Sequence, residues 1–105
     1  MGMGGLALAD SRNAPRDEVH YRARAAGLDG KPLSLLIVNM SALGLMARCD
    51  TEYAVGEKLR VTLPVIGSIM AEIRWSLGGR IGCELDRPIE LADYYEVLAA
   101  LIKGS

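Results

Sequence analysis

Two arginines four residues apart, Arg12 and Arg16, lie near the start of the 105-residue chain with the spacing Arg-x-x-x-Arg. A guanidinium is always charged and carries a planar fork of five N–H donors, so it binds phosphate through paired hydrogen bonds and stacks on bases. The same fork matches the O6 and N7 acceptors on the edge of guanine. Two such groups on a flexible segment could therefore approach one compact anionic ligand from different sides.

A second group of polar residues interrupts an apolar run and has the spacing Asn-x-Ser-x-x-Gly over residues 39–44. Asn39 offers an amide donor and an acceptor, Ser41 offers a hydroxyl, and Gly44 allows the backbone a close approach. Asn39 and Ser41 could also serve only to build a turn, through hydrogen bonds from side chain to backbone. Both roles can hold at the same residues.

The composition excludes several classes of protein. The chain has 12 Lys and Arg residues and 13 Asp and Glu residues, which gives a formal net charge of -1. Proteins that coat a nucleic-acid polymer or a membrane surface need an excess of cations, so the composition argues against both classes. A single His and the absence of an assembled nucleophile, base and orienting group argue against an enzyme or a metal site. Cys49 and Cys83 lack Cys-x-x-Cys spacing, and we expect two buried reduced thiols rather than the alternative, a disulfide between them.

The pattern of apolar residues predicts the elements that position these groups. Alternation with period two indicates six strands, at 18–28, 33–40, 45–49, 58–63, 68–77 and 80–85. After residue 86 the period becomes helical, which predicts a helix over about 88–103 with Pro88 in its first position. The chain is therefore expected to be dominated by β-structure: a six-stranded antiparallel barrel with one C-terminal α-helix over a mouth or side of it.

The same alternation assigns side chains to faces. Trp75 falls on the inward face of its strand, so core packing is favoured over the alternative, a wall beside a ligand. Arg22 and Arg24 fall on an exposed face, from which they could extend a cationic surface around a binding site. Apolar runs stay far below the ~20 residues that span a bilayer, and the start lacks the cationic region of a signal peptide, so a cytoplasmic location is expected.

The two motifs, in this order and at this separation, resemble those of the PilZ domain, a bacterial receptor for the second messenger cyclic di-GMP. The resemblance covers roughly residues 12–102. The segment 72–75, Glu-Ile-Arg-Trp, is similar to a strand of that family that ends in Trp, and 82–85, Gly-Cys-Glu-Leu, is similar to its closing strand. Ser11 stands where many members carry a further Arg, which favours one ligand molecule per domain.

The resemblance implies a split PilZ-type barrel at about 18–85 within a single domain of residues 12–103, preceded by a flexible arm at 1–11. It implies that Arg12 and Arg16 contact phosphate and guanine, that Asn39 and Ser41 read the base and a nearby phosphate, and that Gly44 holds the turn. Arg22, Arg24 and Trp75 are possible secondary contacts.

The function implied is that of a non-catalytic receptor without cofactor or metal. Ligand binding orders the arm and signals to a partner protein, in control of processes such as motility or biofilm formation. A monomer or weak dimer is expected, with no nucleic-acid polymer and no membrane insertion. One alternative is a ligand-independent adaptor of the same fold, which would be marked by a lost Arg or turn residue. Another is a single-strand nucleic-acid binder, which would need a basic groove with stacking aromatic residues.

Overall fold

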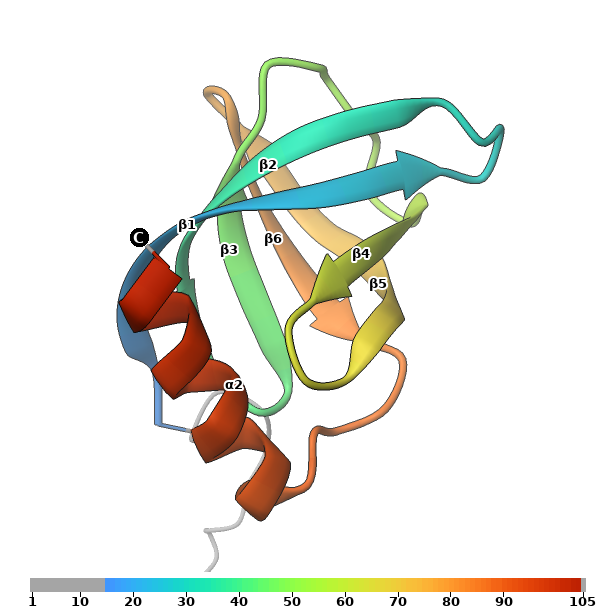
Figure 1. The fold of residues 1–105 in the computed structure, drawn as a ribbon. Coiled ribbons are helices and arrows are strands. Elements are labelled where there is room, and N and C mark those ends of the chain that lie inside the picture. Colours follow the sequence, from blue (N-terminus) through green and yellow to red (C-terminus); the bar gives the residue numbers. More distant parts are fainter. Residues whose placement is uncertain (1–14, 105) are drawn as a thin grey trace, which may run out of the picture.

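A computed structural model describes residues 15–104, which form a closed antiparallel barrel and one helix (Figure 1). The strands are β1 (Asp17–Gly27), β2 (Pro32–Met40), β3 (Gly44–Arg48), β4 (Lys58–Leu63), β5 (Gly67–Leu77) and β6 (Arg80–Leu85). Their order around the barrel is β1-β2-β3-β6-β5-β4, so two three-stranded meanders meet where β3 pairs with β6 and where β1 pairs with β4. The predicted six-stranded antiparallel barrel is confirmed, and strand ends differ from prediction by a residue or so.

The tight turns follow from local chemistry. In the β1–β2 hairpin, the Asp29 carboxylate accepts a hydrogen bond from the Lys31 N–H at 2.9 Å, a turn that Asp favours. Gly78 and Gly79 join β5 to β6 and both have positive φ, at 61° and 80°. Two consecutive residues of this conformation match the twist of a two-residue hairpin, and glycine adopts it without steric cost.

The core fills the barrel with alternate side chains of every strand. Representative members are fully buried: Ala23, Leu35, Ile37, Val61, Ala71, Ile73 and Ile81. Cys49 and Cys83 are buried as free thiols, as predicted. Burial, with a smaller contribution from Cys49, raises the pKa of Cys83 to about 12, so this thiol stays protonated at neutral pH.

The alternation fails at the end of β5. A β-bulge lies between Ile73 and Trp75, where Ile73 pairs with Cys83 and Trp75 pairs with Gly82. A bulge inserts one residue on one strand and shifts the following side chains to the other face. Trp75 and Leu77 are therefore 39% and 78% exposed, and the prediction of a core Trp75 is wrong.

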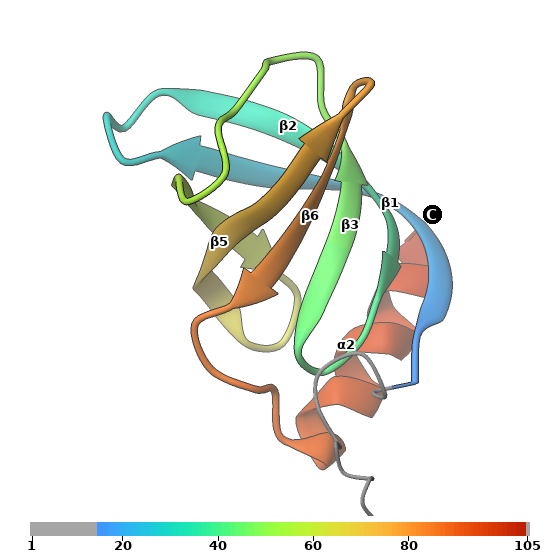
Figure 2. The ribbon, with the colours of Figure 1, turned by 180° about the vertical axis from the view of Figure 1, so that it is seen from behind.

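The helix, α2 (Leu91–Gly104), begins three residues later than predicted, so Pro88 does not occupy its first position. Residues 88–90 instead run in non-helical conformation, because Ile89 is buried and its N–H donates to the Ala42 carbonyl at 2.8 Å. The helix then packs Tyr94, Val97 and Leu101 into the barrel core, beside the start of β1 (Figures 1 and 2). No helix in this described part of the chain has the length and apolar character needed to cross a bilayer.

Candidate ligand-binding site

The turn between β2 and β3 is built by Ser41. Its N–H donates to the Gly44 carbonyl at 2.8 Å, and its side-chain oxygen accepts from the Leu43 N–H at 3.1 Å. Ser41 is 2% exposed, so these bonds replace the hydration that burial removes. The turn-building role considered for Ser41 is therefore present.

The turn is fixed to the rest of the fold by backbone contacts. The Leu85 N–H donates to the Leu43 carbonyl at 2.9 Å, and Gly44 pairs with Glu84 in the β3–β6 ladder. A side chain at Gly44 would collide with the carbonyl oxygen of Cys83. Glycine is thus required here because β3 and β6 approach each other closely. The backbone that lies against Gly44 is that of β6.

Arg16 and Asn39 bring the two sequence motifs into contact. The Arg16 guanidinium donates through Nη1 to Asn39 Oδ1 at 3.1 Å, and Asn39 Nδ2 lies 3.6 Å from the Met46 sulfur. Asn39 sits at a register shift between β2 and β3, where its side chain is half-buried. The amide is thereby held with its oxygen toward Arg16.

A hollow of about 280 Å³ opens on the outer surface of β3, β6 and β5. Figure 2 shows these three strands from the side opposite to Figure 1. Four predicted site residues line it: Arg16, Ser41 and Gly44 from the motifs, and Trp75 of β5, predicted as a possible secondary contact. Asn39 does not line the hollow but contacts two residues that do, Arg16 and Met46. The volume is near the lower limit of small-ligand sites, so it suits one end of a dinucleotide-sized ligand.

Trp75 is placed by a glycine on the neighbouring strand. A side chain at Gly82 would collide with the indole of Trp75, so the missing Cβ leaves the space that the ring occupies. Trp75 thus lies against the backbone of β6 with part of its surface exposed. Sequence reasoning missed this role of Gly82, because only the bulge in β5 turns Trp75 outward.

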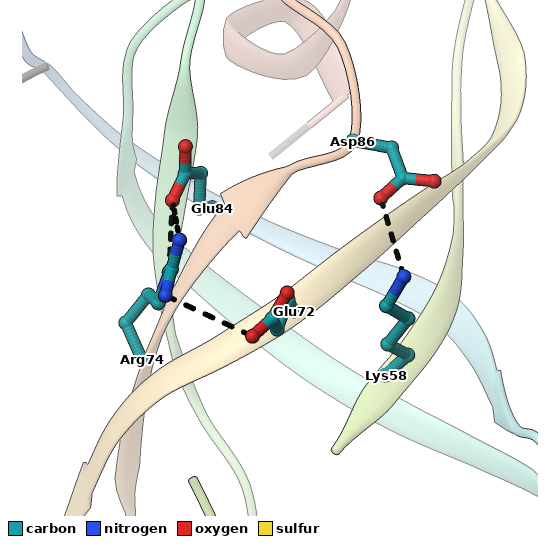
Figure 3. Close-up of polar contacts among 5 residues, drawn as sticks. All are labelled: Lys58, Glu72, Arg74, Glu84 and Asp86. Carbon is teal, nitrogen blue, oxygen red and sulfur yellow. Dashed lines mark hydrogen bonds and ion pairs between the residues drawn. The ribbon is translucent and has the colours of Figure 1, made fainter. Parts of the chain in front are cut away.

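Arg74 and Glu84, which sequence reasoning also missed as site residues, form the ion pair drawn in Figure 3. Both residues line the hollow. Arg74 Nε and Nη2 both donate to Glu84 Oε1, at 2.8 and 2.5 Å, while Nη1 lies 3.8 Å from Glu72 Oε2. The hydrogen bonds to Glu84, then the charges of Glu84 and Glu72, raise the pKa of Arg74 above its usual range. The separate Lys58–Asp86 pair lies elsewhere in Figure 3.

Helix α2 fixes the start of β1, directly after Arg16. The Tyr94 hydroxyl lies 2.6 Å from Asp17 Oδ2 and 3.0 Å from the Met40 carbonyl oxygen, and can donate to either. Burial, followed by the hydrogen bond to Asp17, raises the pKa of Tyr94, so its hydroxyl remains a donor at neutral pH. Tyr94 thereby ties together the ends of β1 and β2, next to Arg16 and Asn39.

The remaining predicted residues lie apart from this site. Arg22 and Arg24 project from the exposed face of β1, where Arg22 Nη1 contacts Ser34 Oγ at 3.5 Å, and neither lines the hollow. Arg12, like Ser11 and the arm at 1–11, falls outside the described residues. Between residues 15 and 104, no three His, Cys, Asp or Glu side chains gather in a way that could hold a metal ion.

The fold resembles a solved structure. No family model and no curated protein matches the sequence. Among solved structures, the chain is similar to the PilZ domain with c-di-GMP of YcgR from Escherichia coli. The TM-score is 0.56 and the identity 12%, over 90% of this chain and 92% of the other. The protein therefore has a PilZ-like fold, as the two motifs implied.

Proposed function

We propose that this protein is a non-catalytic receptor for cyclic di-GMP. The observation that carries the proposal is the contact of Arg16 with Asn39 beside the hollow, because it unites the two motifs on a PilZ-like fold. The ligand in the structural neighbour adds support for the class of molecule bound.

The chemistry of the hollow suits one guanylate half of this ligand. Arg16 supplies a fork for phosphate or for the guanine edge, and Asn39 and Ser41 supply neutral polar groups nearby. Trp75 presents an aromatic surface on which a base can stack, an interaction worth about 1–3 kcal/mol per base. The hollow is too small for both guanines, so the second base must reach beyond it.

The signal in this proposal is an order change. The ligand contacts Arg12 and Arg16 together with the 39–44 turn, and so draws the arm onto the barrel and creates a new surface. A partner protein then recognises that surface. Because Asn39 already positions Arg16, the residues that ligand binding orders in this proposal are Arg12 and the arm at 1–11.

Calorimetric titration with cyclic di-GMP tests the proposal. We expect saturable binding near one ligand per chain, and a tenfold to hundredfold loss of affinity in Arg16→Ala, because that change removes charge-assisted hydrogen bonds worth roughly 1.5–3 kcal/mol. Arg60→Ala removes the same charge from the exposed face of β4 and is the matched control. Absence of binding by the unaltered protein would contradict the proposal and favour a ligand-independent adaptor. Equal affinities of Arg16→Ala and Arg60→Ala would contradict the site.

A further inference from the structure

We propose that Arg74 forms a second phosphate-binding position in the hollow, and that the neighbouring Glu84 weakens ligand binding there. The inference rests on the proposed function, because it names a further contact for the same ligand. Cyclic di-GMP has two phosphates, and in the described part of the chain the two arginines that line the hollow are Arg16 and Arg74.

The bulge in β5 is the first observation behind this proposal. Consecutive residues of a regular strand point to opposite faces, so Arg74 and Trp75 would not share a site on an unbulged strand. The irregularity between Ile73 and Trp75 makes both side chains exposed and places both on the wall of one hollow. Bulges are enriched beside functional sites for this reason, since they redirect side chains. An aromatic surface and a cation thus lie side by side, as a stacked base and its phosphate would require.

The hydrogen bonds of Arg74 leave part of its fork available. Nε and one N–H of Nη2 are used by Glu84 Oε1. Nη1 is 3.8 Å from Glu72 Oε2, which is beyond hydrogen-bonding distance. Figure 3 marks the bonds to Glu84 and the longer ion pair between Nη1 and Glu72. A phosphate can bind the edge formed by Nη1 and the second N–H of Nη2 by displacing the Glu72 ion pair, while the other edge keeps the Glu84 carboxylate.

Glu84 has two opposing effects on a doubly charged ligand. Its oxygen orients Arg74, but its negative charge lies on the same wall and repels phosphate. The side chains of Arg74 and Glu84 are 57% and 47% exposed, and ion pairs at such positions contribute little. A glutamine at 84 keeps an oxygen that can orient Arg74 and removes the charge. Glu84→Gln should therefore bind the ligand more tightly, by about two- to fivefold.

The test is a set of cyclic di-GMP titrations on folded variants of the full chain. Arg74→Ala should weaken binding about tenfold, with Arg60→Ala as a control that loses the same charge. Glu84→Gln should strengthen binding, with Glu96→Gln on the exposed part of α2 as its control. Glu84→Gln should increase the affinity less when Arg74 has already been replaced by Ala than it does in the unaltered protein. The reason is that the guanidinium whose phosphate contact it favours is then missing.

The outcomes separate this inference from the proposed function. If the unaltered protein binds and Arg16→Ala weakens binding, but Arg74→Ala matches Arg60→Ala, the second position is wrong and the receptor function stands. If Glu84→Gln binds no more tightly than Glu96→Gln, the role of Glu84 is wrong. Failure of the unaltered protein to bind cyclic di-GMP would contradict both proposals.

Discussion

Arg16 and Asn39 are 23 residues apart in the sequence and hydrogen-bonded in the fold, with Nη1 and Oδ1 separated by 3.1 Å. Asn39 lies in β2, whereas Arg16 directly precedes β1, so the bond fixes a cation beside the first strand of the barrel. The guanidinium therefore lies at the hollow before any ligand is bound, and this reduces the ordering cost of binding.

The Asn39 contact leads to a first prediction. Asn39→Ala should weaken cyclic di-GMP binding about two- to tenfold, because it removes the charge-assisted hydrogen bond that orients Arg16 but leaves Arg16 itself in place. Calorimetry measures the change. Ser34→Ala is the matched control, since Ser34 also lies on β2 and contacts an arginine, Arg22, away from the hollow. Equal affinities of the two variants would show that Asn39 does not position Arg16.

Gly44→Ala should lower the free energy of unfolding by about 1–3 kcal/mol, because the added methyl collides with the Cys83 carbonyl and forces β3 away from β6. Urea denaturation measures this loss. Gly27→Ala is the control, since the nearest atom to its added Cβ would be a side-chain oxygen of Asp29 at 3.0 Å, whereas at Gly44 it would be a backbone oxygen at a shorter distance. If Gly44→Ala is as stable as Gly27→Ala, the two strands do not require a glycine at this approach.

Gly82→Ala should displace Trp75 from its place against β6 and weaken ligand binding. Trp75 is the single Trp of the chain, so its fluorescence reports on the site alone. We expect the emission of the unliganded variant to shift, and the emission change that ligand causes in the unaltered protein to diminish. Unchanged emission in Gly82→Ala would mean that the indole does not occupy the space beside Gly82.

Tyr94 makes stability depend on pH in the alkaline range. Its pKa in the folded state is raised above the unfolded value of about 10, so folding favours the neutral hydroxyl. The stabilisation is complete below about pH 10 and is lost as the pH rises above it, because the unfolded chain then releases the proton first. Tyr94→Phe should be less stable by about 1–3 kcal/mol at pH 7, since Asp17 and Met40 lose a donor.

The difference in stability between the unaltered protein and Tyr94→Phe should therefore be constant to about pH 10 and narrow above it. Taking the difference removes the contribution of Cys83, whose raised pKa acts in the same direction in both proteins. A difference that stays constant up to pH 11 would contradict the assigned effect of burial and of Asp17 on Tyr94.

Much of the fold could be predicted because period-two alternation and paired turn residues act locally. Val61 and Ile69, for example, are buried where the alternation placed them. Trp75 could not be placed, since a bulge arises from pairing between β5 and β6 and leaves no mark in the pattern of either strand. The start of α2 was missed for a similar reason: Ile89 is held by Ala42, a contact far away in the sequence.

The motifs identified Arg16, Ser41 and Gly44 at the hollow, but Arg74, Gly82 and Glu84 became visible only in the fold. Each of these three acts through a neighbour on another strand: Arg74 pairs with Glu84, and Gly82 makes room for Trp75. The role of such residues depends on which residue of the neighbouring strand lies opposite. Their spacing in a single sequence therefore does not reveal it.

The most direct test of the receptor function is an amide NMR titration of the unaltered full chain with cyclic di-GMP. We predict saturable shifts at Arg16, Ser41 and Gly44 together with ordering of the arm, while amides near Leu28 and Gly56, which lie outside the hollow, stay unchanged. A spectrum that does not respond to ligand, or responds only near Leu28 and Gly56, would contradict the account.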